Sequence, residues 1–139
     1  MSAESAYLVD TNVVSELARK APDARVIAWF GSLERLTISA VTLEELTFGI
    51  ERVRAPATGG RLRRWFDGLL ASEPRVLPVD DRIARLAGNL RAQRERSGSV
   101  VAQADMLIAA TALAHGLVLV TRNVADFDRC GVTLLNPFR

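Results

Sequence analysis

Cysteine, histidine and lysine are nearly absent from this sequence. Cys130, His115 and Lys20 are the single members of their residue types among 139 residues. One cysteine cannot form an internal disulfide, and one cysteine with one histidine cannot supply the four ligands of a structural zinc site. We therefore expect Cys130 to pack in the core and His115 to lie at a helix end.

Long apolar runs are also missing. No run approaches the roughly 20 apolar residues that a membrane-spanning helix needs. The segment Met1–Ser5 is small and polar, without the basic start and apolar stretch of a secretory signal. With 49% hydrophobic and 24% charged residues, the composition is that of an ordinary globular protein. These features predict a cytoplasmic protein without a membrane partner, folded as one domain.

Short apolar runs alternate along the chain with segments of helical periodicity. The runs end at polar residues and predict strands, whereas the segments between them repeat apolar residues every three or four positions. Such alternation predicts an α/β fold with a mostly parallel central sheet and helices on both faces. The expected strands are Ala6–Val9, Leu36–Ser39, Arg75–Val79, Leu117–Thr121 and Val132–Leu135. The expected helices are Val13–Arg19, Ala24–Ser32, Val41–Arg54, Gly60–Ser72, Asp81–Arg96 and Val101–His115.

Local signals mark several ends of these helices. The segment Arg54–Gly60 contains a proline and two glycines, which predict a loop. The Asp80-Asp81 pair is expected to cap the helix that follows it. Gly116 is expected to end the last helix in the left-handed conformation.

Acidic and polar residues follow the expected strands, and parallel sheets form their sites beyond the carboxyl ends of strands. Asp10 comes directly after the first strand, where a buried carboxylate needs a cation or hydrogen-bond donors nearby. The alternative for Asp10 is a helix cap, a role that Asn12 could fill equally well. The residues alone leave both interpretations open.

Two glutamates, Glu44 and Glu45, follow the second expected strand within the first turns of a helix. Thr42 and Glu45 have the spacing of a capping box, in which the glutamate bonds back to the backbone N–H of the cap residue. Neither glutamate falls on the apolar stripe of that helix, so periodicity does not separate them. A capping role and a site role both remain open.

Asp105 is the one carboxylate in the otherwise apolar or small stretch Ala102–Thr111. An ionised acid in that setting needs a cation or donors around it. The alternative is a favourable interaction with the helix N-terminus, worth about 0.3–1 kcal/mol. If the sheet brings Asp10, Glu45 and Asp105 together, a hard cation such as Mg²⁺ or Mn²⁺ would offset their repulsion. Such ions activate water in phosphodiester hydrolysis.

Four segments carry motifs in a definite order and spacing. They are Leu8–Glu16 (LVDTNVVSE), Ser39–Leu46 (SAVTLEEL), Ala104–Ala112 (ADMLIAATA) and Val120–Phe127 (VTRNVADF). Together they resemble the PIN-domain ribonucleases, in particular the VapC-type and FitB-like toxins of bacterial toxin–antitoxin pairs. The resemblance covers essentially the whole chain, and the ending Leu134–Phe138 is similar to the FitB-like branch. It implies a PIN-like three-layer fold, a single PIN domain over residues 1–139 and a Mg²⁺- or Mn²⁺-dependent endoribonuclease.

The resemblance also assigns roles to individual residues. It makes Asp10, Glu45 and Asp105 the catalytic acids that hold the metal, and it selects Glu45 over Glu44 because Glu45 directly precedes Leu46. Thr11, Asn12 and Thr121 are the residues expected to support these carboxylates through hydrogen bonds.

The fourth acidic position departs from the pattern of some family members. Asn123 stands where they carry an acid, and Asp126 lies three residues further on. Both are therefore candidate ligands, and occupancy of a second metal site is left open. The alternative for Asp126 is a turn or cap residue before Phe127.

Arginine dominates the cationic residues, although the formal net charge is only +2. Its forked guanidinium suits phosphate, so the composition permits a nucleic-acid partner without requiring one. The arginines expected to position RNA are Arg122, Arg61, Arg63 and Arg64.

The implied partners are a cognate antitoxin protein, an RNA substrate, operator DNA through the antitoxin only, and a second copy in a homodimer. One alternative is a phosphatase or phosphoacceptor on a similar sheet, but the late lysine of such folds is absent because Lys20 is early. Another is a catalytically weak PIN-like binding module that acts through an antitoxin–DNA complex. Retention of all three principal acids argues against that module.

Overall fold

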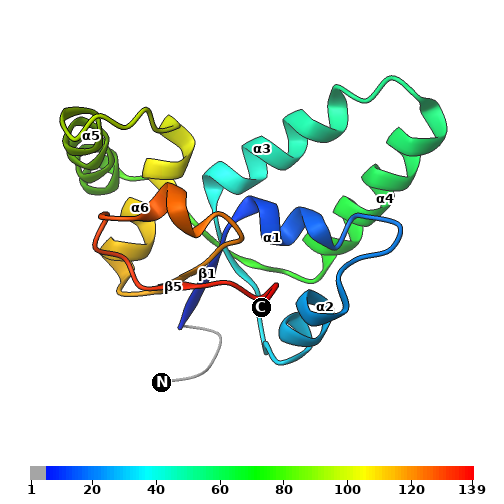
Figure 1. The fold of residues 1–139 in the computed structure, drawn as a ribbon. Coiled ribbons are helices and arrows are strands. Elements are labelled where there is room, and N and C mark those ends of the chain that lie inside the picture. The colour runs from blue at the N-terminus through cyan, green and yellow to red at the C-terminus, as the bar shows by residue number, and fades with distance from the viewer. Residues whose placement is uncertain (1–5) are drawn as a thin grey trace.

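Short strands alternate with helices in the computed structural model, which describes residues 6–139 (Figure 1). The segment 1–5, on which the expected lack of a secretory signal rested, lies outside the described residues. The strands are β1 (Tyr7–Val9), β2 (Thr37–Ser39), β3 (Arg75–Leu77), β4 (Val118–Val120) and β5 (Leu134–Leu135). The helices are α1 (Thr11–Glu16), α2 (Ala24–Gly31), α3 (Ala40–Glu51), α4 (Pro56–Ala71), α5 (Asp81–Arg96), α6 (Gln103–His115) and the 3₁₀ helix η2 (Val124–Phe127).

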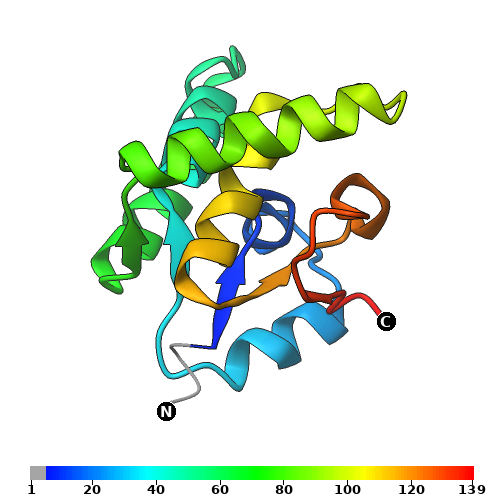
Figure 2. The same ribbon diagram turned by 90° about the vertical axis from the view of Figure 1, so that its left-hand side faces the viewer.

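All strand pairs in the described part of the chain are parallel. β4 pairs with β1 and β5, and β2 pairs with β3. β1 also contacts β2, so the strands run side by side through the centre of the molecule (Figure 2). The carboxyl ends of β1, β2 and β4 therefore lie at the same edge, where a parallel sheet forms its site.

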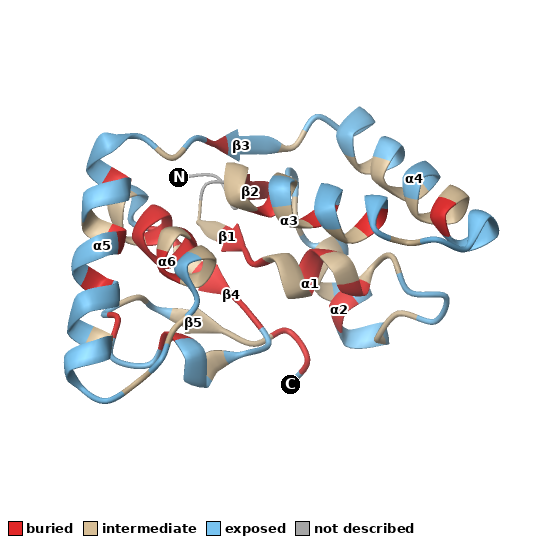
Figure 3. Ribbon diagram, turned by 90° about the horizontal axis from the view of Figure 1, so that it is seen from above, coloured by how far each residue is buried: buried red, intermediate tan, exposed pale blue. Residues whose placement is uncertain are grey.

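Successive residues of the central strands enter opposite cores. Leu8 and Leu119 pack in a cluster with residues of α5 and α6. Val9 and Val120 pack in a second cluster with residues of α1, α2, α3 and α4. The strands β1, β2 and β4 are largely buried between the two helical groups (Figure 3), which confirms the expected α/β class with helices on both faces.

Most helices agree with their expected ranges to within a few residues. α5 has the expected bounds, and Asp80 caps it by accepting a hydrogen bond from the N–H of Ile83 at 2.8 Å. Gly116 ends α6 in the left-handed conformation with φ of 64°. Cys130 is buried and His115 is the last residue of α6, as expected. No helix among residues 6–139 is long and apolar enough to cross a bilayer.

The prediction of a loop over Arg54–Gly60 is wrong for the residues after Ala55. α4 begins at Pro56 and includes Gly59 and Gly60. A proline suits the first turn of a helix, because its missing N–H has no intrahelical partner there and its φ is already helical. The two glycines are then carried inside a helix whose other residues pack against α3.

Helix α1 begins earlier than the expected Val13, and it ends at Glu16 rather than at Arg19. Asp10 occupies the N-cap and accepts a hydrogen bond from the N–H of Thr11 at 2.8 Å. The capping interpretation of Asp10 is therefore correct, whereas Asn12 lies inside the helix.

Candidate active site

Asp10 is held by neutral donors at the carboxyl end of β1. Val9 stands opposite Val120, so Asp10 and Thr121 leave neighbouring strands together. Thr121 Oγ1 donates to Asp10 Oδ2 at 2.8 Å, and Asn12 Nδ2 donates to the same oxygen at 3.2 Å. Only 4% of the Asp10 surface is exposed.

The environment of Asp10 disfavours its ionised form. Its pKa is raised to about 6, chiefly because burial removes the carboxylate from water. The negative charges of Asp105 and Glu45 raise the pKa further, while the hydrogen bonds from Thr121 and Thr11 lower it. No arginine or lysine among residues 6–139 forms an ion pair with Asp10. A bound cation would therefore stabilise this carboxylate.

Glu45 is positioned by a residue that follows Asp10 in the chain. Thr11 Oγ1 donates to Glu45 Oε1 at 2.6 Å and lies 3.0 Å from Thr42 Oγ1. Glu45 is partly buried in the second turn of α3, whereas Glu44 is exposed. The structure thus separates the two glutamates that periodicity left equivalent.

The capping box, one of the two alternatives for Thr42 and Glu45, does not form. The N-cap of α3 is Ser39, whose hydroxyl accepts from the N–H of Val41 at 3.0 Å. β2 passes into α3 without a loop, so the last strand residue becomes the cap and Thr42 lies one turn inside the helix. The Thr42 side chain is buried, and no local sequence signal points to its contact with Thr11.

Asp105 lies in the first turn of α6 and is half-buried. Burial raises its pKa, and the charges of Asp126 and Glu45 raise it further. Asp126 belongs to η2, which follows β4. Asp10, Glu45 and Asp105, from three different parts of the chain, therefore lie within electrostatic reach of one another, and Asp126 lies within reach of Asp105.

Asn123 precedes η2 and makes no side-chain capping bond. Its backbone N–H donates to Thr121 Oγ1 at 3.1 Å, and its residue is exposed. Asp126 lies within η2 rather than at a cap, and its negative charge raises the pKa of Asp105.

The acids are neighbours without forming a closed cage. Among residues 6–139, no three His, Cys, Asp or Glu side chains are grouped as tightly as a preformed metal site requires. The donor set nevertheless consists of oxygens, which suits Mg²⁺ or Mn²⁺ rather than zinc. Mg²⁺ is commonly held by one or two carboxylates together with waters and substrate phosphates, and an open arrangement of acids fits that habit.

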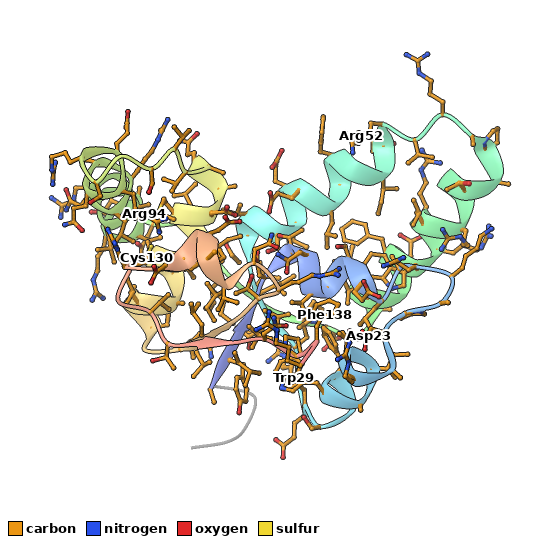
Figure 4. The ribbon with its side chains drawn as sticks, in the orientation of Figure 1. Asp23, Trp29, Arg52, Arg94, Cys130 and Phe138 are labelled. Atoms are coloured by element: carbon orange, nitrogen blue, oxygen red, sulfur yellow. The ribbon has the colours of Figure 1, made fainter. Side chains whose placement is uncertain are left out.

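Arg94 joins α5 to the segment that carries Asp126. Arg94 Nη1 donates to the carbonyl oxygens of Asp126, at 3.1 Å, and Asp128, and contacts Cys130 Sγ at 3.6 Å. Figure 4 shows Arg94 and Cys130 close together on the side of the molecule where α5 lies. No local sequence pattern indicates this contact, because the residues lie more than 30 positions apart along the chain.

Two of the arginines expected to position RNA have protein partners away from the acids. Arg63 pairs with Glu51 at 3.2 Å, and Arg61 Nη1 donates to the carbonyl oxygen of Ala18 at 2.6 Å. Arg64 is exposed on α4 without an ion pair within the described residues.

The backbone of Arg122 contacts the site, whereas its side chain contacts Phe138. Its N–H donates to Asn12 Oδ1 at 3.2 Å, while its guanidinium lies 4.6 Å from the centre of the Phe138 ring. Asn12 therefore links the strand end that carries Asp10 to the one that carries Arg122.

A groove of about 580 Å³ lies between α1, α3 and α4 and begins beside Thr11 and Glu45. Further along, Phe48 and Arg52 of α3 line it, opposite Trp65 of α4. Phe48 and Arg52 were not among the expected site residues, although they follow Glu45 at helical spacing. The wall of the groove also includes Ser15, Arg19, Arg61 and Leu62.

A parallel sheet between helical layers, with acids at the carboxyl ends of its strands, defines a class of α/β proteins with an acidic site. Within that class, the PIN domain family matches residues 7–132. The chain belongs to the PIN domain family.

Relatives with curated names agree with this assignment. The chain is 40% identical to VapC ribonuclease Y4jK of Sinorhizobium fredii, with 94% of this chain and 96% of that protein covered. It is 36% identical to Toxin FitB of Neisseria gonorrhoeae, with 94% and 97% covered. The resemblance to VapC-type and FitB-like proteins, seen first in the four motifs, is confirmed.

Solved structures show the same fold. The crystal structure of FitAcB from Neisseria gonorrhoeae superposes with a TM-score of 0.86 at 35% identity, covering 96% of this chain and 99% of that chain. The crystal structure of DNA-bound VapBC from Salmonella typhimurium superposes with a TM-score of 0.82 at 30% identity, covering 95% of this chain and 98% of that chain.

Proposed function

We propose that this protein is a divalent-metal-dependent endoribonuclease and the toxin of a toxin–antitoxin pair. The observation that carries the proposal is Asp10, a buried carboxylate beside Asp105 and Glu45 that no cation of residues 6–139 neutralises. A set of oxygen ligands with uncompensated charge fits a metal-assisted hydrolase better than a scaffold. The ribonuclease and toxin names of the relatives support the same activity.

Asp10, Glu45 and Asp105 would hold Mg²⁺ or Mn²⁺, with Asp126 and Asn123 at the edge of the site. When bound, such an ion supplies an activated water and stabilises charge on the phosphodiester during hydrolysis. The protein's own part is to hold the carboxylates in place. Thr121 and Asn12 orient Asp10, and Thr11 orients Glu45.

RNA reaches the acids along the groove that begins at Glu45. Arg52 lines this groove and forms no ion pair within the described residues, so its guanidinium is available to the RNA backbone. Arg122 is held over Phe138 beside the site and adds positive charge there. These contacts position the phosphodiester bond, whereas the acids supply its chemistry.

The protein partner is a cognate antitoxin, and operator DNA is bound through that antitoxin. FitAB bound to a DNA fragment and DNA-bound VapBC, both similar in fold to this chain, support this assignment. Homodimerisation is part of the same proposal.

The test is RNA cleavage by the purified protein with Mg²⁺ or Mn²⁺, with a chelator and with a DNA substrate. We expect RNA degradation that requires the metal, and losses on the order of 100-fold or more in Asp10→Asn, Glu45→Gln and Asp105→Asn. Glu44→Gln is the matched control, because Glu44 neighbours Glu45 but is exposed. Full activity in Asp105→Asn, or cleavage that persists in chelator, would contradict the proposal.

A further inference from the structure

We propose that the outer face of α5 binds the sugar–phosphate backbone of a folded RNA, away from the acidic site. This face consists of Arg82, Arg85, Asn89, Gln93 and Arg96, which we call the arginine stripe. The inference rests on the proposed ribonuclease function and adds to it a second contact with the RNA. Such a contact would let the enzyme favour a structured RNA over a short single strand.

The arginine stripe follows one side of α5, because its members recur every three or four residues along the helix. All five are exposed, and they span about 21 Å at a rise of 1.5 Å per residue. The other side of α5 carries Ile83, Ala87 and Leu90, which are buried in the core cluster shared with α6. In Figure 3 the buried residues of α5 face α6 and its outer side is exposed. The stripe therefore points away from α6, the helix that carries Asp105.

The basic charge of the protein is concentrated on α5. This helix has five arginines and two acids, whereas the whole chain has a formal net charge of only +2. Arg82, Arg85 and Arg96 form no ion pair with any described residue, although Asp81 and Glu95 lie on the same helix. A solvated surface normally mixes charges of both signs. A line of unpaired arginines instead attracts a polyanion such as a nucleic-acid backbone.

The chemistry of the stripe favours RNA over a protein partner. None of the exposed large apolar side chains of the described residues lies on α5, whereas the centre of a protein interface is commonly apolar or aromatic. Asn89 and Gln93 lie between the arginines, and their amides suit phosphate oxygens and 2′-hydroxyl groups. Because the 2′-hydroxyl distinguishes RNA from DNA, the stripe is assigned to RNA.

Gly88 lies beside the stripe at a position that the protein does not require to be glycine. It is exposed within the helix, where glycine is less favourable than alanine. A Cβ at Gly88 would meet no atom within 4 Å, so internal packing does not account for the missing side chain. An open hollow of about 620 Å³ lies here, lined by Gly88, Arg82, Arg85, Leu86 and Asn89. The glycine leaves room for a phosphate backbone to approach the helix between the arginines.

The binding test uses a fluorescently labelled RNA hairpin and the full-length protein in EDTA, so that binding is measured without cleavage. The double variant Arg82→Gln/Arg85→Gln should bind the hairpin about 10-fold to 100-fold less tightly. The slope of log affinity against log salt concentration should fall by about 2, because two phosphate contacts are lost. A DNA hairpin of the same sequence should bind wild type less tightly than the RNA does.

Two further variants act as control and as a test of shape. Arg91→Gln makes the same change of charge on the same helix, but Arg91 lies off the stripe and lines a separate hollow with Gln103 of α6. It should bind nearly as well as wild type. Gly88→Leu keeps every charge and fills the hollow beside Arg85. It should weaken hairpin binding without changing the salt dependence, and its thermal midpoint should not fall, because the added side chain meets no protein atom.

Cleavage with Mn²⁺ separates the stripe from the acidic site. The double variant should cleave a short single-stranded RNA at the wild-type rate, since that substrate does not reach the outer face of α5. For a folded RNA it should show a raised KM with unchanged kcat. A failure of the ribonuclease assignment would appear differently, as absent cleavage of both substrates by wild type while hairpin binding in EDTA persists.

Several outcomes would overturn the stripe as an RNA-binding surface. Wild-type affinity and salt slope in Arg82→Gln/Arg85→Gln would remove it outright. An equal loss in Arg91→Gln would mean that only the overall charge matters. Equal or tighter binding of the DNA hairpin would contradict the assignment to RNA. If the double variant kept its RNA affinity but changed its oligomeric state, the face would be an interface between copies of the chain.

Discussion

Thr11 connects the two acids supplied by β1 and α3. Its backbone N–H donates to Asp10 Oδ1 at 2.8 Å, and its hydroxyl donates to Glu45 Oε1 at 2.6 Å. A single residue therefore fixes both carboxylates relative to the sheet edge. The hydroxyl takes no part in the bond to Asp10, so its role can be tested without changing that bond.

Replacing Thr11 with valine should loosen Glu45 while preserving the shape of the side chain. We expect metal affinity and RNA cleavage to fall about 10-fold to 100-fold, as for other groups that orient ligands. The free energy of unfolding should fall by about 1–3 kcal/mol, because the partly buried hydrogen bonds of the hydroxyl with Glu45 and Thr42 are lost. Cleavage assays and metal titration measure the effect, and Thr11→Ser should restore it. Failure of serine to restore activity would mean that the hydroxyl is not the cause.

Metal binding should stabilise the fold of the wild-type protein. An ion bound only by the native arrangement of acids raises the free energy of unfolding, by about 2.7 kcal/mol at 100 times its dissociation constant. Thermal unfolding with and without Mn²⁺ measures this shift. Asp10→Asn should abolish it, and Glu44→Gln should retain it. An equal shift in wild type and Asp10→Asn would place the ion elsewhere.

The raised pKa of Asp10 predicts an unusual dependence of stability on pH in the metal-free protein. The pKa of Asp10 is about 6 in the folded state, against 3.8 for an aspartate free in water. The folded protein therefore binds this proton more tightly than the unfolded chain does. Its contribution to stability is therefore present below about pH 4 and is lost as the pH rises to about 6, by about 3 kcal/mol.

Urea unfolding in EDTA across this range tests the sign. Asp10→Asn cannot ionise and should flatten this part of the profile, leaving the variant more stable than wild type near pH 7. A wild-type stability that rises steadily from pH 4 to pH 7, unchanged in shape by Asp10→Asn, would contradict the assigned direction.

Asn123 and Asp126, at the fourth acidic position, should affect the binding of a second metal ion more than that of the first. Asp126→Asn should reduce activity less than Asp105→Asn does, because Asp126 acts on Asp105 from η2. Asn123→Asp should tighten metal binding by adding a charged oxygen beside the site. Cleavage assays on Asp126→Asn and Asp105→Asn measure the first effect, and calorimetric metal titration of Asn123→Asp and wild type measures the second. Tight binding of two ions by the RNA-free wild type would show this view of the fourth position to be wrong.

Arg94 should act through Asp126. Arg94→Gln removes the donors that hold the Asp126 and Asp128 carbonyls, so we expect a loss of about 1–3 kcal/mol in stability and a fall in activity. If Arg94 acts only by holding Asp126 in position, the double variant Arg94→Gln/Asp126→Asn should be as active as the less active of the two single variants. Fully additive losses in this double-mutant cycle would show two independent roles.

The sequence by itself determined the fold class and the family, and it singled out the acids that we propose as the site. Alternating apolar runs and helical periods report burial, which is local, and they predicted the strands and α5 closely. Asp10 and Asp105 stood out because each interrupts an apolar stretch. The four motifs then identified the PIN family, and with it Glu45.

Tertiary structure alone decided which residues touch. Thr42 meets Thr11 rather than capping α3, and Arg94 holds the segment of Asp126. These partners lie some 30 positions apart along the chain, so no local period or cap rule relates them. Phe48 lies across the groove from Trp65 only because α4 folds back along α3. α4 begins at Pro56, a residue that the sequence analysis placed in a loop. Burial is encoded residue by residue, whereas contacts between distant side chains depend on how the strands and helices are connected and packed.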